Sequence, residues 1–113
     1  MKAVVLHEYG GPEKLVYEDV PDPVAGEGQV LVRVAATSVN PIDFKLRSGV
    51  MKAFFPLELP TILGRDISGI VRAVGDGVSG FKPGDKVMAV GKKAYAGSMR
   101  PRRMVPVRWP ASL

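Results

Sequence analysis

Residues 29–37 read QVLVRVAAT, and valine stands at every second position of the first six residues. Side chains of an extended chain point to opposite faces in turn, so Val30, Val32 and Val34 share one face. We therefore predict a β-strand over residues 29–37 with a uniformly apolar face.

Shorter apolar runs lie on both sides of this segment. We predict further strands at residues 2–8, 15–19, 68–74 and 85–90. The 13 glycines and 10 prolines recur between these runs, which is typical of short strands joined by tight turns.

Residues 40–49 (NPIDFKLRSG) break the β pattern. Asn40 is a favourable N-cap residue, proline follows at the first helical position, and Asp43 lies in the first turn, where the helix dipole favours an acid. Two bases stand in the last turn, and Gly49 ends the segment. The fold class we predict is mainly β, a small and partly open barrel with one or two short helices.

The composition of the 113 residues excludes several classes of protein. There is no cysteine and one histidine, so disulfides and zinc sites built on sulfur are excluded. No run approaches the roughly 18 apolar residues of a membrane helix, and we expect a soluble, cytoplasmic protein without a membrane partner. The net charge of +5 resides in a tail, because residues 1–91 hold 10 basic and 11 acidic side chains and residues 92–113 hold 6 basic and no acidic ones.

The glycines of residues 75–80 (GDGVSG) satisfy the G-x-G-x-x-G pattern of dinucleotide-binding loops. Such a loop must open a helix, yet Phe81-Lys82-Pro83-Gly84-Asp85 follows and predicts a turn into another strand. We therefore interpret these glycines as part of a loop between two strands.

Four ordered motifs carry a resemblance to a known family. They lie at residues 1–5 (MKAVV), 39–49 (VNPID with Arg47 and Gly49), 63–69 (LGRDISG) and 74–87 (VG through FKPGDKV). Together they resemble the N-terminal domain of medium-chain dehydrogenases/reductases, in the zinc-independent quinone oxidoreductase branch that includes zeta-crystallin. The resemblance covers residues 1–96 and implies a GroES-like β-barrel domain, without the Rossmann domain that completes such enzymes. Residues 97–113 depart from the family and form an atypical basic tail, either a last strand or an aberrant C-terminus.

The resemblance also bears on metal binding. Where zinc-dependent members have a cysteine three residues before an aspartate, this chain has Asn40 before Asp43, and their Gly-His-Glu motif reads Gly64-Arg65-Asp66 here. An amide and a guanidinium do not rebuild a zinc site, so we expect no metal.

The activity that the resemblance implies is hydride transfer from NADPH to a small-molecule quinone or α,β-unsaturated carbonyl compound. The implied residues fall into three overlapping groups: Asn40, Asp43 and Arg65 as catalytic, Asn40, Asp43 and Phe44 as cofactor-binding, and Lys45, Met51 and Arg65 as substrate-binding. Asn40 would donate its amide N–H to the substrate carbonyl or orient the nicotinamide ribose, and Arg65 would stabilise an oxygen on which negative charge develops.

Each of these residues also has a purely structural interpretation. Asn40 is explained as a helix cap, which uses the amide oxygen and leaves the NH₂ group free to donate elsewhere, and Asp43 is explained by the helix dipole. Arg65 is explained by an ion pair with Asp66 or another surface acid. Met51, Phe54 and Phe55 would line a substrate mouth or belong to a loop docked on the barrel, and we interpret His7 as structural.

Further hypotheses concern partners. We expect no tight NADPH binding and no activity by these residues alone, because most cofactor contacts of the family lie in the second domain. A non-enzymatic GroES-like binding or co-chaperonin-type module is the alternative function. A nucleic-acid partner is not expected, because the tail has one aromatic residue, Trp109, and no recognition module. A homodimer or self-association through an open edge is the assembly that the sequence allows.

Overall fold

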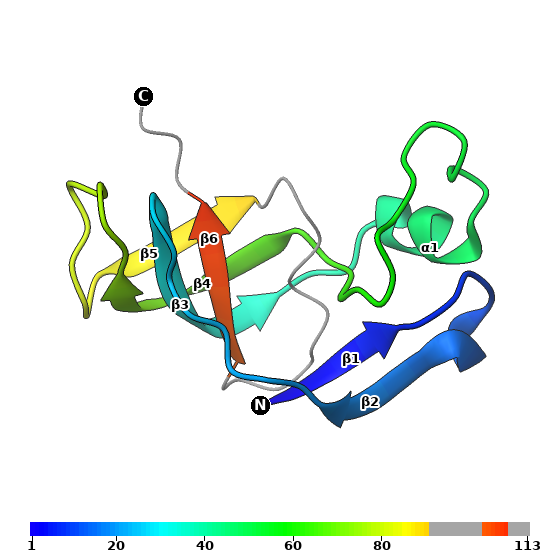
Figure 1. The fold of residues 1–113 in the computed structure, drawn as a ribbon, viewed down its shortest axis with the longest axis horizontal. Coiled ribbons are helices and arrows are strands. Elements are labelled where there is room, and N and C mark those ends of the chain that lie inside the picture. Colours follow the sequence, from blue (N-terminus) through cyan, green and yellow to red (C-terminus); the bar gives the residue numbers. More distant parts are fainter. Residues whose placement is uncertain (91–102, 109–113) are drawn as a thin grey trace.

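The computed structural model describes residues 1–90 and 103–108 (Figure 1). Strands β1 (Lys2–Leu6) and β2 (Leu15–Asp19) form an antiparallel hairpin, with a short 3-10 helix at Pro12–Lys14 between them. Strands β3 (Gln29–Thr37), β4 (Asp66–Val74), β5 (Lys86–Val90) and β6 (Arg103–Arg108) form an antiparallel sheet in the order β5-β4-β3-β6. Helix α1 (Pro41–Ser48) follows β3.

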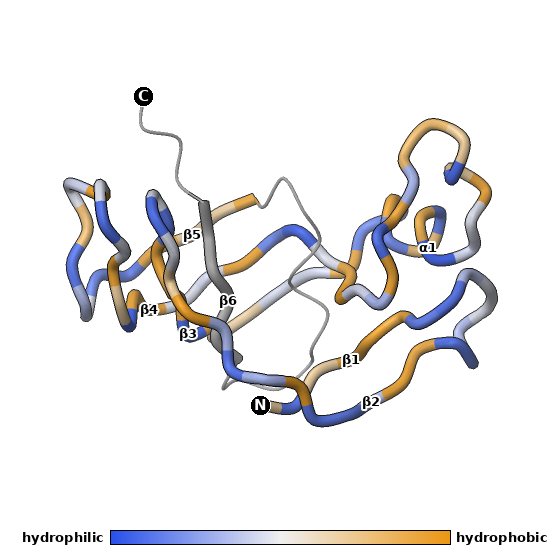
Figure 2. The backbone as a smooth tube through the Cα atoms, in the orientation of Figure 1, coloured by the Kyte–Doolittle hydropathy of each residue, from blue (hydrophilic) through white to orange (hydrophobic). Residues whose placement is uncertain are grey.

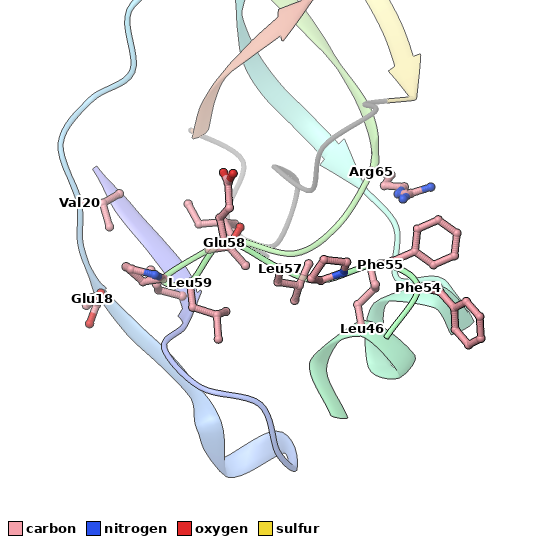
Figure 3. A pocket seen from close by; sticks show the side chains of 14 residues that line it. Glu18, Val20, Leu46, Phe54, Phe55, Leu57, Glu58, Leu59 and Arg65 are labelled. Carbon is pink, nitrogen blue, oxygen red and sulfur yellow. The ribbon is translucent and has the colours of Figure 1, made fainter. Parts of the chain in front are cut away.

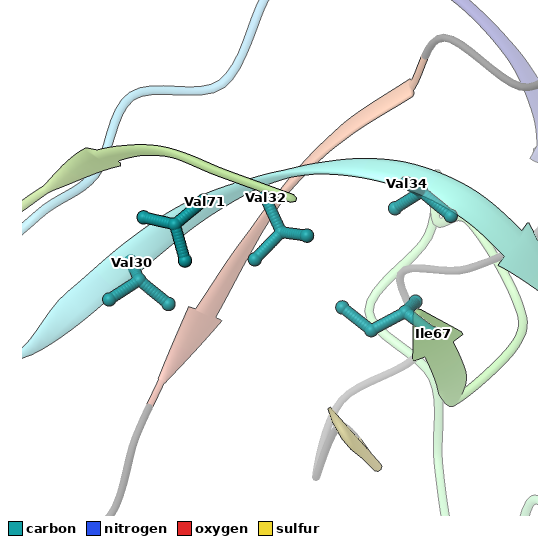
Figure 4. Close-up of a cluster of buried hydrophobic side chains, with 5 residues drawn as sticks. All are labelled: Val30, Val32, Val34, Ile67 and Val71. Carbon is teal, nitrogen blue, oxygen red and sulfur yellow. The ribbon is translucent and has the colours of Figure 1, made fainter. Parts of the chain in front are cut away.

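The four-stranded sheet is built on the apolar face of β3. Val30, Val32 and Val34 are almost fully buried and pack with Ile67 and Val71 of β4 (Figure 4). Gly69 lies opposite Val34 near a bulge, where a Cβ atom would come within 2.2 Å of the Arg33 carbonyl oxygen. The alternation of valines along residues 29–37 therefore forms the core, and glycine is needed where the two strands approach closely.

A second apolar cluster joins the hairpin to the helix. Leu6 of β1, Leu46 of α1 and Leu63 are buried together. Leu6 and Thr61 also exchange both backbone hydrogen bonds, at 2.7 and 2.9 Å. Through these contacts, the segment between α1 and β4 is held against the N-terminal hairpin.

The loop between β4 and β5 contains the G-x-G-x-x-G pattern. Gly75 donates to the carbonyl of Gln29 at 2.8 Å, and a Cβ atom at Gly75 would lie 1.9 Å from the carbonyl oxygen of Gly26. No helix follows, and β4 and β5 pair antiparallel. The interpretation as a loop between strands is confirmed, because close backbone approach explains the first glycine.

The mainly β fold class is confirmed, with one α-helix, one 3-10 helix and open sheets among the described residues. Strand β1 ends at Leu6, two residues earlier than expected, and β4 begins at Asp66, two residues earlier. The predicted domain boundary after residue 96 lies outside the described residues, as do residues 97–102 and 109–113 of the predicted tail. In the described part of the chain, no helix has the length and apolar character to cross a membrane.

Candidate functional site

Helix α1 begins after Asn40, the N-cap residue that the sequence predicts. The N–H of Asn40 donates to Asp43 Oδ2 at 2.7 Å, and the N–H of Asp43 donates to the carbonyl of Asn40 at 2.9 Å. Pro41 occupies the first helical position, and Gly49 ends the helix with a φ of 82°. These contacts fix the orientation of the first helical turn.

Asp43 is the buried charged side chain of this turn, with 8% of its surface exposed. One carboxylate oxygen is used by the cap, and the other, Oδ1, is buried without a hydrogen-bond partner among the residues that the structure describes. The N-terminus of α1 favours the negative charge. Asp43 therefore stabilises the helix and keeps one acceptor unused.

The amide of Asn40 is engaged with β4. Its Nδ2 donates to Asp66 Oδ2 at 2.7 Å and to Ser38 Oγ at 3.3 Å. The hydroxyl of Ser38 donates to the same Asp66 oxygen at 2.6 Å, and the hydroxyl of Thr37 donates to the Asp66 carbonyl at 2.7 Å. The NH₂ group that the sequence leaves available to donate is therefore used here by the carboxylate of Asp66 and the hydroxyl of Ser38.

These hydrogen bonds also act on Asp66 itself. The hydroxyl of Ser38, and next the amide of Asn40, lower the pKa of the Asp66 carboxyl, while partial desolvation opposes them. Asp66 is thus held as a carboxylate that faces Ser38 and Asn40.

Arg65, the residue before Asp66, lines a cavity. Its Nε atom is buried without a partner, and the guanidinium makes no ion pair within residues 1–90. The suggested pair with Asp66 is therefore absent from the described structure, since Asp66 faces Asn40. Within the described part of the chain, the Nε donor of this cation beside the cavity has no acceptor.

The cavity has a volume of about 710 Å³ and lies between the β1-β2 hairpin and the segment after α1 (Figure 3). Its walls are largely apolar. Arg65, Phe54 and Phe55 lie toward one end, and Glu18 and Val20 toward the other (Figure 3). The remaining lining residues are Val5, Leu46, Pro56, Leu57, Glu58, Leu59, Pro60, Thr61 and Ile62.

The structure separates the residues expected to bind substrate. Arg65 lines the cavity, whereas Met51 packs against the Leu6–Leu46–Leu63 cluster. Lys45 is exposed on α1 and does not line this cavity. Phe44, expected to contact the cofactor, is half exposed outside the cavity wall.

Other residues of the wall were not predicted, because the hairpin reaches it only through the tertiary fold. Glu18 of β2 is one of them, and His7 Nε2 lies 2.9 Å from its Oε1.

Tyr9 is a further residue that the sequence did not single out. Its hydroxyl accepts from the N–H of Leu57 at 2.8 Å, and its ring packs where a Cβ atom on Gly49 would come within 3.0 Å. Two further hydrogen bonds join Gly10 to Arg47 of α1. The N–H of Gly10 donates to the Arg47 carbonyl at 2.9 Å, and Arg47 Nε donates to the Gly10 carbonyl at 3.2 Å. Tyr9 therefore fixes the loop after α1, which Figure 2 shows as a largely hydrophobic stretch.

Among the residues that the structure describes, no three His, Asp or Glu side chains are grouped to hold a metal ion.

Comparison with known proteins assigns the fold to a family. The alcohol dehydrogenase GroES-like domain model matches residues 26–105, more than half of the chain. The chain belongs to this family. Among curated relatives, quinone-oxidoreductase QR1, chloroplastic, from Triphysaria versicolor is 42% identical over 91 residues, which are 80% of this chain and 28% of that protein.

Solved structures agree with this assignment. The human synaptic vesicle membrane protein VAT-1 homolog-like protein superposes with a TM-score of 0.84 at 35% identity, over 96% of this GroES-like domain and 32% of that chain. The Escherichia coli quinone oxidoreductase complexed with NADPH superposes with a TM-score of 0.76 at 30% identity. The match covers 100% of this chain and 34% of that chain. The expected quinone oxidoreductase branch is confirmed, and the chain spans about a third of the length of these relatives.

Proposed function

We propose that this chain is the substrate-binding and catalytic half of an NADPH-dependent quinone or enone oxidoreductase. The single observation that carries the proposal is Arg65, a cation at the wall of a largely apolar cavity whose Nε donor has no partner among the described residues. In a desolvated site such a charge stabilises an oxygen that becomes negative when a carbonyl or quinone accepts a hydride. The relatedness to quinone oxidoreductases supports this role.

The roles of the α1 residues follow from their contacts. Asn40 already donates to Asp66, so we assign it to positioning the segment that carries Arg65. We keep Asn40, Asp43 and Phe44 as contacts for the nicotinamide end of the cofactor. The Phe44 ring fits such a contact directly, because it is half exposed, whereas the buried Asp43 carboxylate would act by orienting the first helical turn.

The bound cofactor would supply the hydride, and we assign the rest of its binding site to the roughly two thirds of the NADPH-complexed relative that this chain does not span. We therefore propose that residues 1–113 bind NADPH weakly and do not oxidise it alone. A small-molecule quinone or enone as substrate, a cytoplasmic location and a homodimer also stay predictions, and the plant relative is named as chloroplastic.

The experiment combines the isolated chain with a chimera. Residues 1–96 replace the matching segment of the Escherichia coli quinone oxidoreductase, and NADPH oxidation is followed by absorbance with 1,4-naphthoquinone as acceptor. We expect oxidation by the chimera and none by the isolated chain above a no-protein control. A folded chimera that binds NADPH but reduces neither 1,4-naphthoquinone nor 2-cyclohexenone overturns the proposal.

A further inference from the structure

Phe54 and Phe55 are aromatic side chains that the fold leaves uncovered. They are 81% and 57% exposed, although both line the cavity. Exposed phenylalanines at the mouth of a pocket offer flat apolar surface to a ligand, because aromatic rings gain from offset stacking beyond the area that they bury. Both rings lie at the end of the cavity where Arg65 stands (Figure 3).

The backbone that carries these rings is held in place. The N–H groups of Phe54 and Phe55 both donate to the carbonyl of Met51, at 3.0 and 2.8 Å. Two residues further on, the N–H of Leu57 donates to the hydroxyl of Tyr9. The rings therefore stand on a turn that is anchored on both sides, so a ligand would not have to order it.

We propose that Phe54 and Phe55 are specificity-determining residues that favour fused aromatic quinones over small aliphatic enones, with Tyr9 as the positioning residue of their turn. The inference rests on the proposed function, because it refines the substrate class of the same cavity. A fused ring system presents a face for stacking while its quinone oxygen reaches Arg65. A small aliphatic enone has a carbonyl oxygen for Arg65 but no aromatic face for stacking.

The test measures binding to the 113-residue chain without cofactor, by saturation-transfer NMR and calorimetric titration. The probes are 2,3-dimethyl-1,4-naphthoquinone, whose quinone ring has no free position for addition, and 2-cyclohexenone. The chain has no cysteine that would form thiol adducts. We expect the naphthoquinone to bind at least about tenfold more tightly than the enone.

Substitutions assign the preference to residues. Phe54→Leu and Phe55→Leu keep an apolar side chain and remove the ring, and each should weaken naphthoquinone binding by about threefold to tenfold while enone binding stays unchanged. Met88→Leu is the matched control, because Met88 is 80% exposed on β5 and does not line the cavity. Tyr9→Phe should weaken naphthoquinone binding alone, in a chain whose NMR spectrum remains folded.

Equal affinity for the two probes, or unchanged naphthoquinone binding in the folded Phe54→Leu and Phe55→Leu variants, overturns the inference. Because no NADPH is present, this result is separate from the chimera assay. If the chimera reduces quinones and these substitutions have no effect, the proposed function is supported. The inferred preference for fused aromatic quinones is then overturned.

Discussion

The Nδ2 atom of Asn40 donates to Asp66 Oδ2 over 2.7 Å and thereby ties the start of α1 to the start of β4. Ser38 donates to the same oxygen. One carboxylate thus fixes the N-cap residue and the backbone that carries Arg65. The polar side of the candidate site is organised around Asp66.

Asp66 should make stability depend on pH. Its pKa is lowered in the fold, mainly by Ser38 and then by Asn40, so its contribution is present above the unfolded value of about 4 and is lost as the pH falls through the folded value. We expect the urea midpoint, followed by circular dichroism, to decrease below about pH 4. In Asp66→Asn, the urea midpoint should depend less on pH in this range.

Glu8 contributes to the same pH window, because its hydrogen bond with Lys14 lowers the pKa of Glu8. Part of this pH dependence of the urea midpoint should therefore remain in Asp66→Asn and become smaller in the double variant with Glu8→Gln. An Asp66→Asn protein with the full wild-type slope between pH 2 and 5 would contradict this assignment.

The sequence predicts local elements well in this chain. The valine alternation predicts β3 with its observed bounds, and the cap, proline and glycine of residues 40–49 predict α1. Both signals lie within about ten residues, where backbone geometry sets the pattern.

The candidate site is less predictable because it depends on contacts across the chain. The amide of Asn40 meets an acceptor 26 residues later, and local capping rules do not register such a partner. Glu18 reaches the cavity wall through the pairing of β1 with β2 and the bridge between Leu6 and Thr61. Nothing in residues 15–19 alone indicates this position.

The cluster that joins the hairpin to α1 should be important for stability. Leu6 is fully buried there, so Leu6→Ala removes apolar contacts and leaves a cavity. We expect a loss of about 2–5 kcal/mol in the free energy of unfolding, measured by urea denaturation. Val16→Ala is the control on the paired strand, because Val16 is 42% exposed, and it should cost less than about 1 kcal/mol.

Two glycines of the β4-β5 loop should respond differently to alanine. At Gly75 the new Cβ atom meets the Gly26 carbonyl at 1.9 Å, so the backbone must shift, and we expect a loss of about 1–3 kcal/mol. At Gly77 the space is open, and only the φ of 77° opposes alanine, by about 1 kcal/mol. Thermal unfolding of the two variants measures their relative stability. A Gly75→Ala protein more stable than Gly77→Ala would show that the backbone at Gly75 does not approach Gly26 as described.

The role of Arg65 can be tested in the chimera with the Escherichia coli relative. If Arg65 stabilises the developing negative oxygen, Arg65→Ala should lower kcat/KM for 1,4-naphthoquinone by about 10²-fold, mostly in kcat. Arg65→Lys should recover part of the loss, because it retains the charge without the planar donor geometry.

Asn40→Ala should act through position rather than through charge. It removes the donor to Asp66, and we expect a loss in kcat/KM of about tenfold, smaller than that of Arg65→Ala. Asp66→Asn serves as the comparison, because it weakens the same contact from the other side and should reproduce the effect of Asn40→Ala. Unchanged kcat/KM in both Asn40→Ala and Arg65→Ala would remove these residues from the catalytic site, whereas a larger effect at Asn40 would mean that its amide contacts the substrate directly.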